Sequence, residues 1–224
     1  MNVRHPAPDE LLLDYAVGAT GPGKSLLVAC HLSMCDEARA RFALLEQIGG
    51  AVLETIAPDR LERVTAERVL RAIDGETPVL ERPVRTACAA RPVEVHGIPL
   101  PPPLAAHAEQ IADRRAWRRV GRGVGALELP VSSAEGKTQL LRAAPGVRIV
   151  EHTHMGEEAV LLLSGAFHDN GERYGAGDVA VNDGATTHSP VIDDEDVCLC
   201  LAVTEGPIRF VGRGAWLLNL FNRF

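Results

Sequence analysis

The sequence feature that most restricts the fold is a spaced set of glycine, histidine and glutamate residues. The set is Gly146, five residues, His152, one residue, His154, three residues, Glu158, six residues and Gly165. Side chains alternate between the two faces of a strand, so His152 and His154 point to the same side. A turn at Gly156 then returns Glu158 to that side. The spacing therefore predicts that two imidazoles and one carboxylate converge.

A fourth ligand is expected from a histidine farther along the chain. His188 lies eleven residues after Gly177, beyond the tight turn Gly175-Ala176-Gly177-Asp178. Three histidines and one carboxylate suit Zn²⁺, Fe²⁺, Mn²⁺ or Ni²⁺. We therefore predict one divalent metal ion, with zinc as the first candidate. Its expected ligands are His152, His154, Glu158 and His188.

This stretch resembles the two sequence motifs of the cupin family. The first motif is matched at each fixed position from Gly146 to Gly165. In the second, Asp183 and Ala185 stand where proline and glycine are usual, and Ile192 stands where asparagine is common. The second-motif histidine, His188, keeps its register. The resemblance implies a double-stranded β-helix, or jelly roll, with the metal inside the barrel.

Hydrophobic runs of strand length follow Trp117 and are separated by Gly, Pro, Asn or Asp, which is typical of an all-β sandwich or barrel. The expected strands are 124–129, 137–143, 147–150, 158–163, 166–168, 178–181, 197–203 and 208–211. Cys198 and Cys200 face the same side of one such strand. We interpret them as core residues, with oxidation near a metal as the alternative. His168 is expected at an exposed or edge position.

The N-terminal part has helical periodicity instead. Helices are expected from Asp9 to Gly18, from Pro22, from about Asp36 to just before Gly49, and over about 59–74, with one more at 104–113. Seven prolines between Pro78 and Pro103 predict a linker, because proline neither donates a backbone hydrogen bond nor continues a helix. We expect an α+β chain: a small all-α domain at 1–75, a proline-rich linker at 76–103 and an all-β cupin at 104–224.

One histidine–cysteine pair in the expected second helix is also suited to metal binding. His31 and Cys35 are four residues apart, so the imidazole and the thiolate share one helical face. A structural zinc site needs four ligands. The pair alone therefore fits buried packing residues as well as a zinc site.

Together, the helices, the His–Cys pair, the proline-rich segment and the cupin motifs resemble the ChrR-type anti-sigma factors, the cupin-bearing branch of the zinc anti-sigma family. The likeness covers 9–18, 31–41, the segment around Trp117 and 146–190. In that family the N-terminal motif runs His, three residues, Cys, two residues, Cys. His31 and Cys35 match it, and Ala38 occupies the place of the last cysteine. The family's further histidine corresponds to His5, so the resemblance implies a second zinc site with one ligand replaced.

Composition and charge exclude several classes of protein. The chain is 46% hydrophobic and 24% charged, as in a globular rather than a disordered protein. A net charge of −7 and an aromatic content of 4% argue against direct nucleic-acid binding. The sequence shows neither a run of about 18 apolar residues nor a signal peptide, so we expect a cytoplasmic chain without membrane contact. The five cysteines are odd in number and scattered, which suits reduced thiols or metal ligands.

Two functions agree with these patterns. The resemblance implies an anti-sigma factor whose N-terminal helices sequester an extracytoplasmic-function sigma factor. The cupin would then sense oxidative stress, such as singlet oxygen, and trigger release; a homodimer through the cupin is compatible with this arrangement. The alternative is a cupin metalloenzyme, an Fe²⁺ dioxygenase or metal-assisted lyase, with a helical appendage. Tyr174 is the aromatic hydroxyl between the two motifs that such an enzyme would offer.

Overall fold

The computed structural model describes residues 3–59, 66–75, 93–132 and 136–212. These form two compact units, one of residues 1–46 with 92–224 and the other of residues 47–91. Residues 3–46 share a unit with the β-domain, and the boundaries expected at 75 and 103 stay predictions. Most of the expected linker, residues 76–92, and Cys88 within it, lie outside the described residues.

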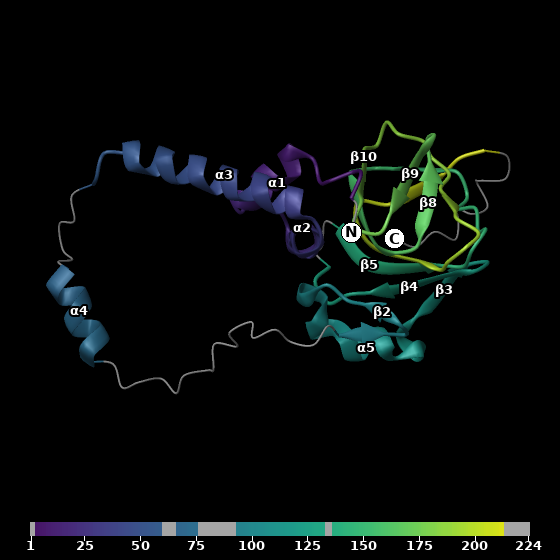
Figure 1. Cartoon of the computed structure of the whole chain (residues 1–224), viewed down its shortest axis with the longest axis horizontal. Helices are drawn as coiled ribbons and strands as arrows, with labels where there is room; N and C mark the ends of the chain where they lie inside the picture. The colour runs from purple at the N-terminus through teal and green to yellow at the C-terminus, as the bar shows by residue number, and fades with distance from the viewer. Residues whose placement is uncertain (1–2, 60–65, 76–92, 133–135, 213–224) are drawn as a thin grey trace. The chain divides into compact units, whose positions relative to one another are not determined.

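Three helices begin the chain and a fourth follows (Figure 1). They are α1 (Asp9–Ala16), α2 (Pro22–Met34), α3 (Asp36–Thr55) and α4 (Ala66–Gly75). Pro22 is the first residue of α2, where no backbone N–H is needed. The expected end of the third helix before Gly49 is wrong, because α3 continues through Gly49 and Gly50, and a glycine weakens a helix by only about 1 kcal/mol. Of the fourth helix expected over about 59–74, α4 covers the part from Ala66, and residues 60–65 lie outside the described residues.

The β-domain is built on a six-stranded antiparallel sheet in the order β10-β7-β12-β5-β4-β3. A three-stranded sheet, β11-β8-β9, and two pairs, β13-β6 and β1-β2, accompany it, and the strands curve around the interior of the domain in Figure 1. The strands are β1 (Glu94–Val95), β2 (Ile98–Pro99), β3 (Arg118–Gly121), β4 (Val124–Glu128), β5 (Gly136–Ala143), β6 (His152–His154), β7 (Glu158–Ser164), β8 (Ala166–Asp169), β9 (Glu172–Gly175), β10 (Val179–Asn182), β11 (Val191–Ile192), β12 (Cys198–Glu205) and β13 (Ile208–Phe210).

Two of the expected elements differ in the structure. Residues 147–150 are not a strand and make one isolated bridge, between Arg148 and Val191. The N–H of Ile149 donates to Pro190, which has no N–H to return, so the ladder does not extend. The helix expected at 104–113 is a 3₁₀ turn, η1 (Pro102–His107), followed by the short α5 (Ala108–Ala112). A second 3₁₀ turn, η2 (Arg114–Ala116), leads into β3.

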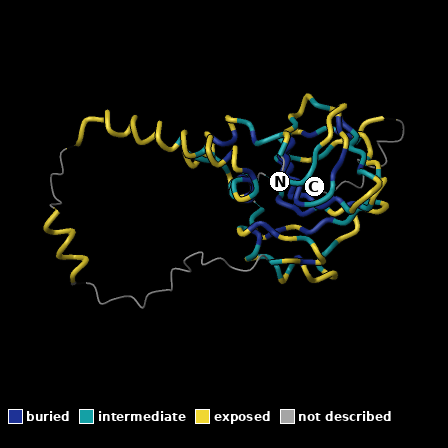
Figure 2. The backbone as a smooth tube through the Cα atoms, viewed as in Figure 1, coloured by how far each residue is buried: buried dark blue, intermediate teal, exposed yellow. Residues whose placement is uncertain are grey.

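The N-terminal helices share a hydrophobic core with the β-domain. Leu12 of α1 and Leu27 of α2 are fully buried in the same cluster as Leu104, Leu161 and Leu201. Figure 2 colours parts of the first two helices and many of the strands as buried. None of the helices that the structure describes has the length and apolar character needed to cross a bilayer.

Adjacent leucines of α1 provide a test of this shared core. Leu12 is 0% exposed and Leu13 is 47% exposed. We expect Leu12→Ala to lower the free energy of unfolding by about 2–5 kcal/mol, because it leaves a cavity in the shared cluster. The matched Leu13→Ala should change it by about 0.5 kcal/mol or less. Urea unfolding followed by tryptophan fluorescence measures both, and equal effects would contradict the shared core.

Candidate metal centre

Four buried side chains from three β-segments meet inside the β-domain. His152 and His154 begin and end β6, Glu158 is the first residue of β7, and His188 lies between β10 and β11. Each offers one ligand atom, and these atoms all lie within 4.8 Å of one another. The structure therefore brings together the four residues that the sequence predicts as a metal site.

Backbone pairing fixes the position of these residues. His152 and His188 form an antiparallel bridge, in which each N–H donates to the other's carbonyl at 3.0 Å. Gly156 makes the turn between β6 and β7, and a Cβ atom there would overlap the carbonyl oxygen of Glu205. Glycine at this position thus permits the close approach that returns Glu158 to the side of the two histidines.

The spacing of the donor atoms suits a single ion. The Nε2 atom of His154 is 3.0 Å from that of His188 and 3.2 Å from Oε2 of Glu158. The Nε2 atom of His188 is 3.8 Å from the same oxygen. Donors that share one ion at about 2.1 Å each lie roughly 3–3.5 Å apart, so the set is close to what a divalent cation requires.

Hydrogen bonds outside the cluster orient two of the imidazoles. Nδ1 of His152 donates to the carbonyl of Val150 at 2.7 Å, and Nδ1 of His188 donates to the Asp169 carboxylate at 2.7 Å. Since these partners accept hydrogen bonds, Nδ1 carries the proton in both rings and the Nε2 lone pairs remain for the centre. Burial, together with the neighbouring His188, lowers the pKa of His152, which favours the neutral form that binds metals.

Asp169 is the site residue that sequence reasoning missed. It ends β8, is buried, and meets His188 from a different hairpin. The following residues, Asn170 and Gly171, read as a tight turn, so the local sequence indicates a turn rather than a partner for a histidine. The sequence signal that could have indicated Asp169 is a carboxylate directly before a hairpin turn, and this signal is weak.

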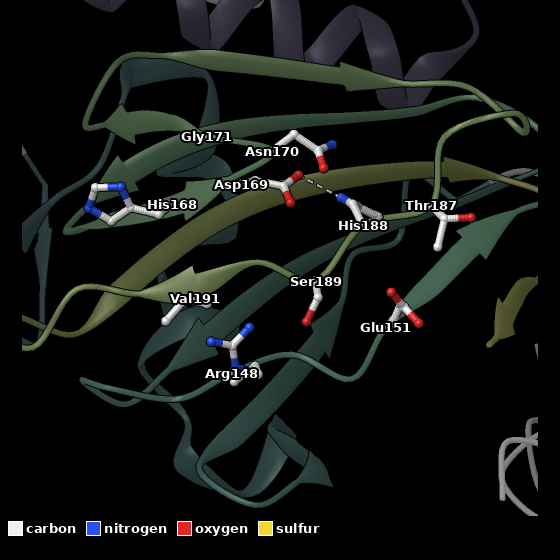
Figure 3. A pocket seen from close by; sticks show the side chains of 10 residues that line it. All are labelled: Arg148, Glu151, His168, Asp169, Asn170, Gly171, Thr187, His188, Ser189 and Val191. Atoms are coloured by element: carbon white, nitrogen blue, oxygen red, sulfur yellow. Dashed lines mark hydrogen bonds and ion pairs between the residues drawn. The ribbon is translucent and has the colours of Figure 1, made fainter. Parts of the chain in front are cut away.

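A pocket of about 320 Å³ opens beside the hydrogen-bonded pair Asp169 and His188 (Figure 3). Asp169 and His188 form part of its wall, joined by their hydrogen bond. The full lining is Arg148, Glu151, His168, Asp169, Asn170, Gly171, Thr187, His188, Ser189 and Val191. Small molecules in this pocket would therefore reach the hydrogen-bonded pair that orients one ligand.

Other residues singled out in the sequence lie outside the cluster of four. Cys198 and Cys200 are buried in a core with Phe167, as expected for packing residues. The hydrogen bond with Cys198 and then burial raise the pKa of Cys200, so its thiol is protonated. His168 is exposed and contacts Asp193 at 3.1 Å. The Tyr174 ring, on β9, packs against Phe167 with the ring centroids 5.2 Å apart.

The structure does not gather the predicted N-terminal ligands into a second cluster within the described residues. His31 is fully buried; its Nδ1 donates to the carbonyl of Gly177 at 3.1 Å and its Nε2 accepts from the N–H of Ala7 at 3.0 Å. Cys35 Sγ accepts from the N–H of Ala38 at 3.4 Å. The His5 ring lies against Tyr174, with 4.4 Å between centroids. As placed here, these residues do not fit a zinc ion.

The fold and the site define a class: a cupin whose interior holds three histidines and one glutamate that can bind a metal ion. Residues 107–209 match the family described as the ChrR cupin-like domain. The chain is also 37% identical over 210 residues to the anti-sigma-E factor ChrR of Cereibacter sphaeroides. This alignment covers 94% of this chain and 93% of that protein.

A solved structure agrees with the sequence comparison. The chain resembles one from the crystal structure of Rhodobacter sphaeroides SigE in complex with the anti-sigma ChrR, with a TM-score of 0.73 and 34% identity. The match covers 91% of this chain and all of that one. This chain belongs to the ChrR family of anti-sigma factors. The expected fold class, N-terminal helices and a C-terminal cupin, is confirmed.

Removal of one predicted ligand should abolish metal binding at the cupin. We expect the purified chain to hold about one equivalent of zinc, and His154→Ala to hold none, because the remaining donors no longer enclose the ion. His168→Ala is the matched control, since His168 is an exposed histidine of the same domain. Elemental analysis of the dialysed proteins measures the metal content. Zinc retained by His154→Ala would contradict the assignment.

Asp169 should strengthen metal binding without being a ligand. We expect Asp169→Asn to weaken zinc affinity by about 10–100-fold, because the amide no longer orients and polarises His188 as the carboxylate does. Competition with a chelator of known affinity measures the change. Asp193→Asn is the control, since Asp193 pairs with the exposed His168 and Arg173 instead. Equal affinities of the two variants would contradict this role.

Proposed function

We propose that this chain sequesters an extracytoplasmic-function sigma factor through its helical region. The observation that carries the proposal is 37% identity to an anti-sigma factor across nearly the whole of both chains. The similar solved chain was crystallised with a sigma factor. The net charge of −7 suits a partner with basic, DNA-binding surfaces. We expect this sequestration to take place in the cytoplasm, where sigma factors meet RNA polymerase.

Exposed apolar side chains on α3 support a protein partner. Ile48 and Val52 are four residues apart, so they lie along one side of the helix, and each is more than half exposed, as is Ile56 just beyond the helix end. Figure 2 colours this part of α3 as exposed. Helix α4, considered by itself, exposes Val69, Leu70 and Ile73. Apolar stripes of this kind mark surfaces that another protein covers.

We further propose that the cupin senses oxidative stress, such as singlet oxygen, and thereby controls release of the sigma factor. The site supports this role, because imidazoles and thiols are readily oxidised side chains and both occur inside this domain. Cys198 and Cys200 lie on β12, which pairs with β7, the strand that begins with Glu158. A bound divalent ion would supply a charge that holds the four ligands together, and its loss would free them.

Substitutions on α3 test the sequestration. We expect Ile48→Asp and Val52→Asp each to weaken binding of the full chain to its extracytoplasmic-function sigma factor by about 30-fold or more, since a charge would replace an apolar contact. Co-purification and titration calorimetry measure this. Val120→Asp is the matched control, because Val120 is an exposed valine on β3. Unchanged affinity of both α3 variants would exclude this surface, and absence of any complex with wild-type chain would refute the function.

A further inference from the structure

Helix α2 is docked on the cupin at two points, and the first is an ion pair at its N-terminal end. Nζ of Lys24 lies 2.8 Å from Glu157 and 2.6 Å from Glu205, and the lysine side chain is only 15% exposed. Burial alone would lower the pKa of Lys24, yet the two carboxylates raise it, so the ammonium stays charged. Beside it, a Cβ on Gly23 would overlap Oγ1 of Thr138, which shows how closely α2 approaches the sheet.

The second point is His31, near the C-terminal end of α2. A backbone carbonyl can only accept and an amide N–H can only donate, so Nδ1 carries the proton toward Gly177 and Nε2 accepts from Ala7. The same turn of the cupin binds the chain that precedes α1. The Asp178 carboxylate accepts from the N–H groups of Arg4 and His5 at 2.6 and 3.0 Å.

Both docking points lie on the segments that position Glu158. Glu157 precedes this ligand directly, and the N–H of Glu205 donates to the carbonyl of Glu157 at 2.8 Å. Gly177 leads into β10, which pairs with β7 so that Asn182 lies opposite Glu158. The amide of Asn182 is in turn 3.5 Å from Nδ1 of His188. Backbone pairing thus connects Glu158 to the cupin segments that hold both ends of α2.

We propose that Lys24 and His31 are positioning residues that couple the occupancy of the cupin metal site to the docking of helix α2. With an ion present, Glu158 is held and Glu157 keeps its place opposite Lys24. Without one, the buried carboxylate and imidazoles lose a common partner, and the turn at 155–158 relaxes away from α2. This coupling deepens the proposed function, on which it rests, by naming the contact through which a signal in the cupin reaches the helices.

Hydrogen exchange measured by mass spectrometry on the full chain tests the coupling. The probe is Zn²⁺, added in excess or removed with a chelator. In the wild-type chain we expect Zn²⁺ to slow exchange in β7, which reports binding, and also in α2 by about tenfold. In Lys24→Met and His31→Leu, the β7 response should persist and the α2 response should be lost. Arg41→Met is the control, since Arg41 pairs only with Asp9 and Glu37 within the helices among its described contacts.

Conservative variants separate docking from a general loss of folding. Lys24→Arg keeps the charge and His31→Gln keeps one donor and one acceptor, so both should retain the α2 response. If Lys24→Met is poorly folded, the charge swap Lys24→Glu with Glu205→Lys should restore the response that Lys24→Glu loses.

A wild-type chain in which Zn²⁺ protects β7 but not α2 would overturn the proposal, as would an unchanged response in Lys24→Met and His31→Leu. Absence of β7 protection would overturn the metal site itself, whereas failed sigma binding in the separate assay would refute the proposed function alone.

Discussion

The bridge between His152 and His188 is the contact on which the site depends. Two segments 36 residues apart in the sequence exchange a pair of backbone hydrogen bonds at 3.0 Å, and both side chains of this pair are buried members of the candidate metal site. Without the bridge, the β6 histidines and the second-motif histidine would belong to unrelated loops. Since β6 also pairs with β13, the ligand strand is held on both sides. Strand pairing on both sides of β6 thus brings the side chains of the candidate metal site together.

The packing of the helices on this domain changes how the chain can be divided. Leu12 and Leu27 contribute to the same core as strands β7 and β12, so the first two helices depend on the cupin for burial. Helices α1 and α2 alone would bury little. Sharing a core supplies the missing burial for α1 and α2, while α3 keeps an apolar side exposed along its second half. A chain that binds a partner through helices needs both properties, a fixed base and an uncovered surface.

Local periodicity and turn glycines were sufficient to predict much of this structure. The alternation at His152 and His154 and the return at Gly156 depend on a few neighbouring residues, and the convergence of His152, His154 and Glu158 could be predicted from them. His188 was predicted instead from its position after the Gly175–Asp178 turn. The sequence did not predict Asp169, because its partner His188 is 19 residues away and reached only through tertiary pairing. The same limit applies to residues 147–150, where a hydrophobic run reads as a strand but Pro190 opposite it cannot complete a ladder. Docking of α2 on the cupin also depends on long-range contacts that no local pattern contains.

His31 shows how one residue can keep a motif position and change its role. In this chain both nitrogens of the ring are bonded to backbone groups, and Ala38, at the place of a motif cysteine, is fully buried. A zinc ion bound by His31 would have to break one of these hydrogen bonds and leave a buried backbone group without its partner, which costs about 1–3 kcal/mol. These hydrogen bonds fix the C-terminal end of α2 in place, which is the effect that a metal ion bound by His31 would have. That point is a turn of the cupin, so in this chain the helix end and the metal domain are joined directly.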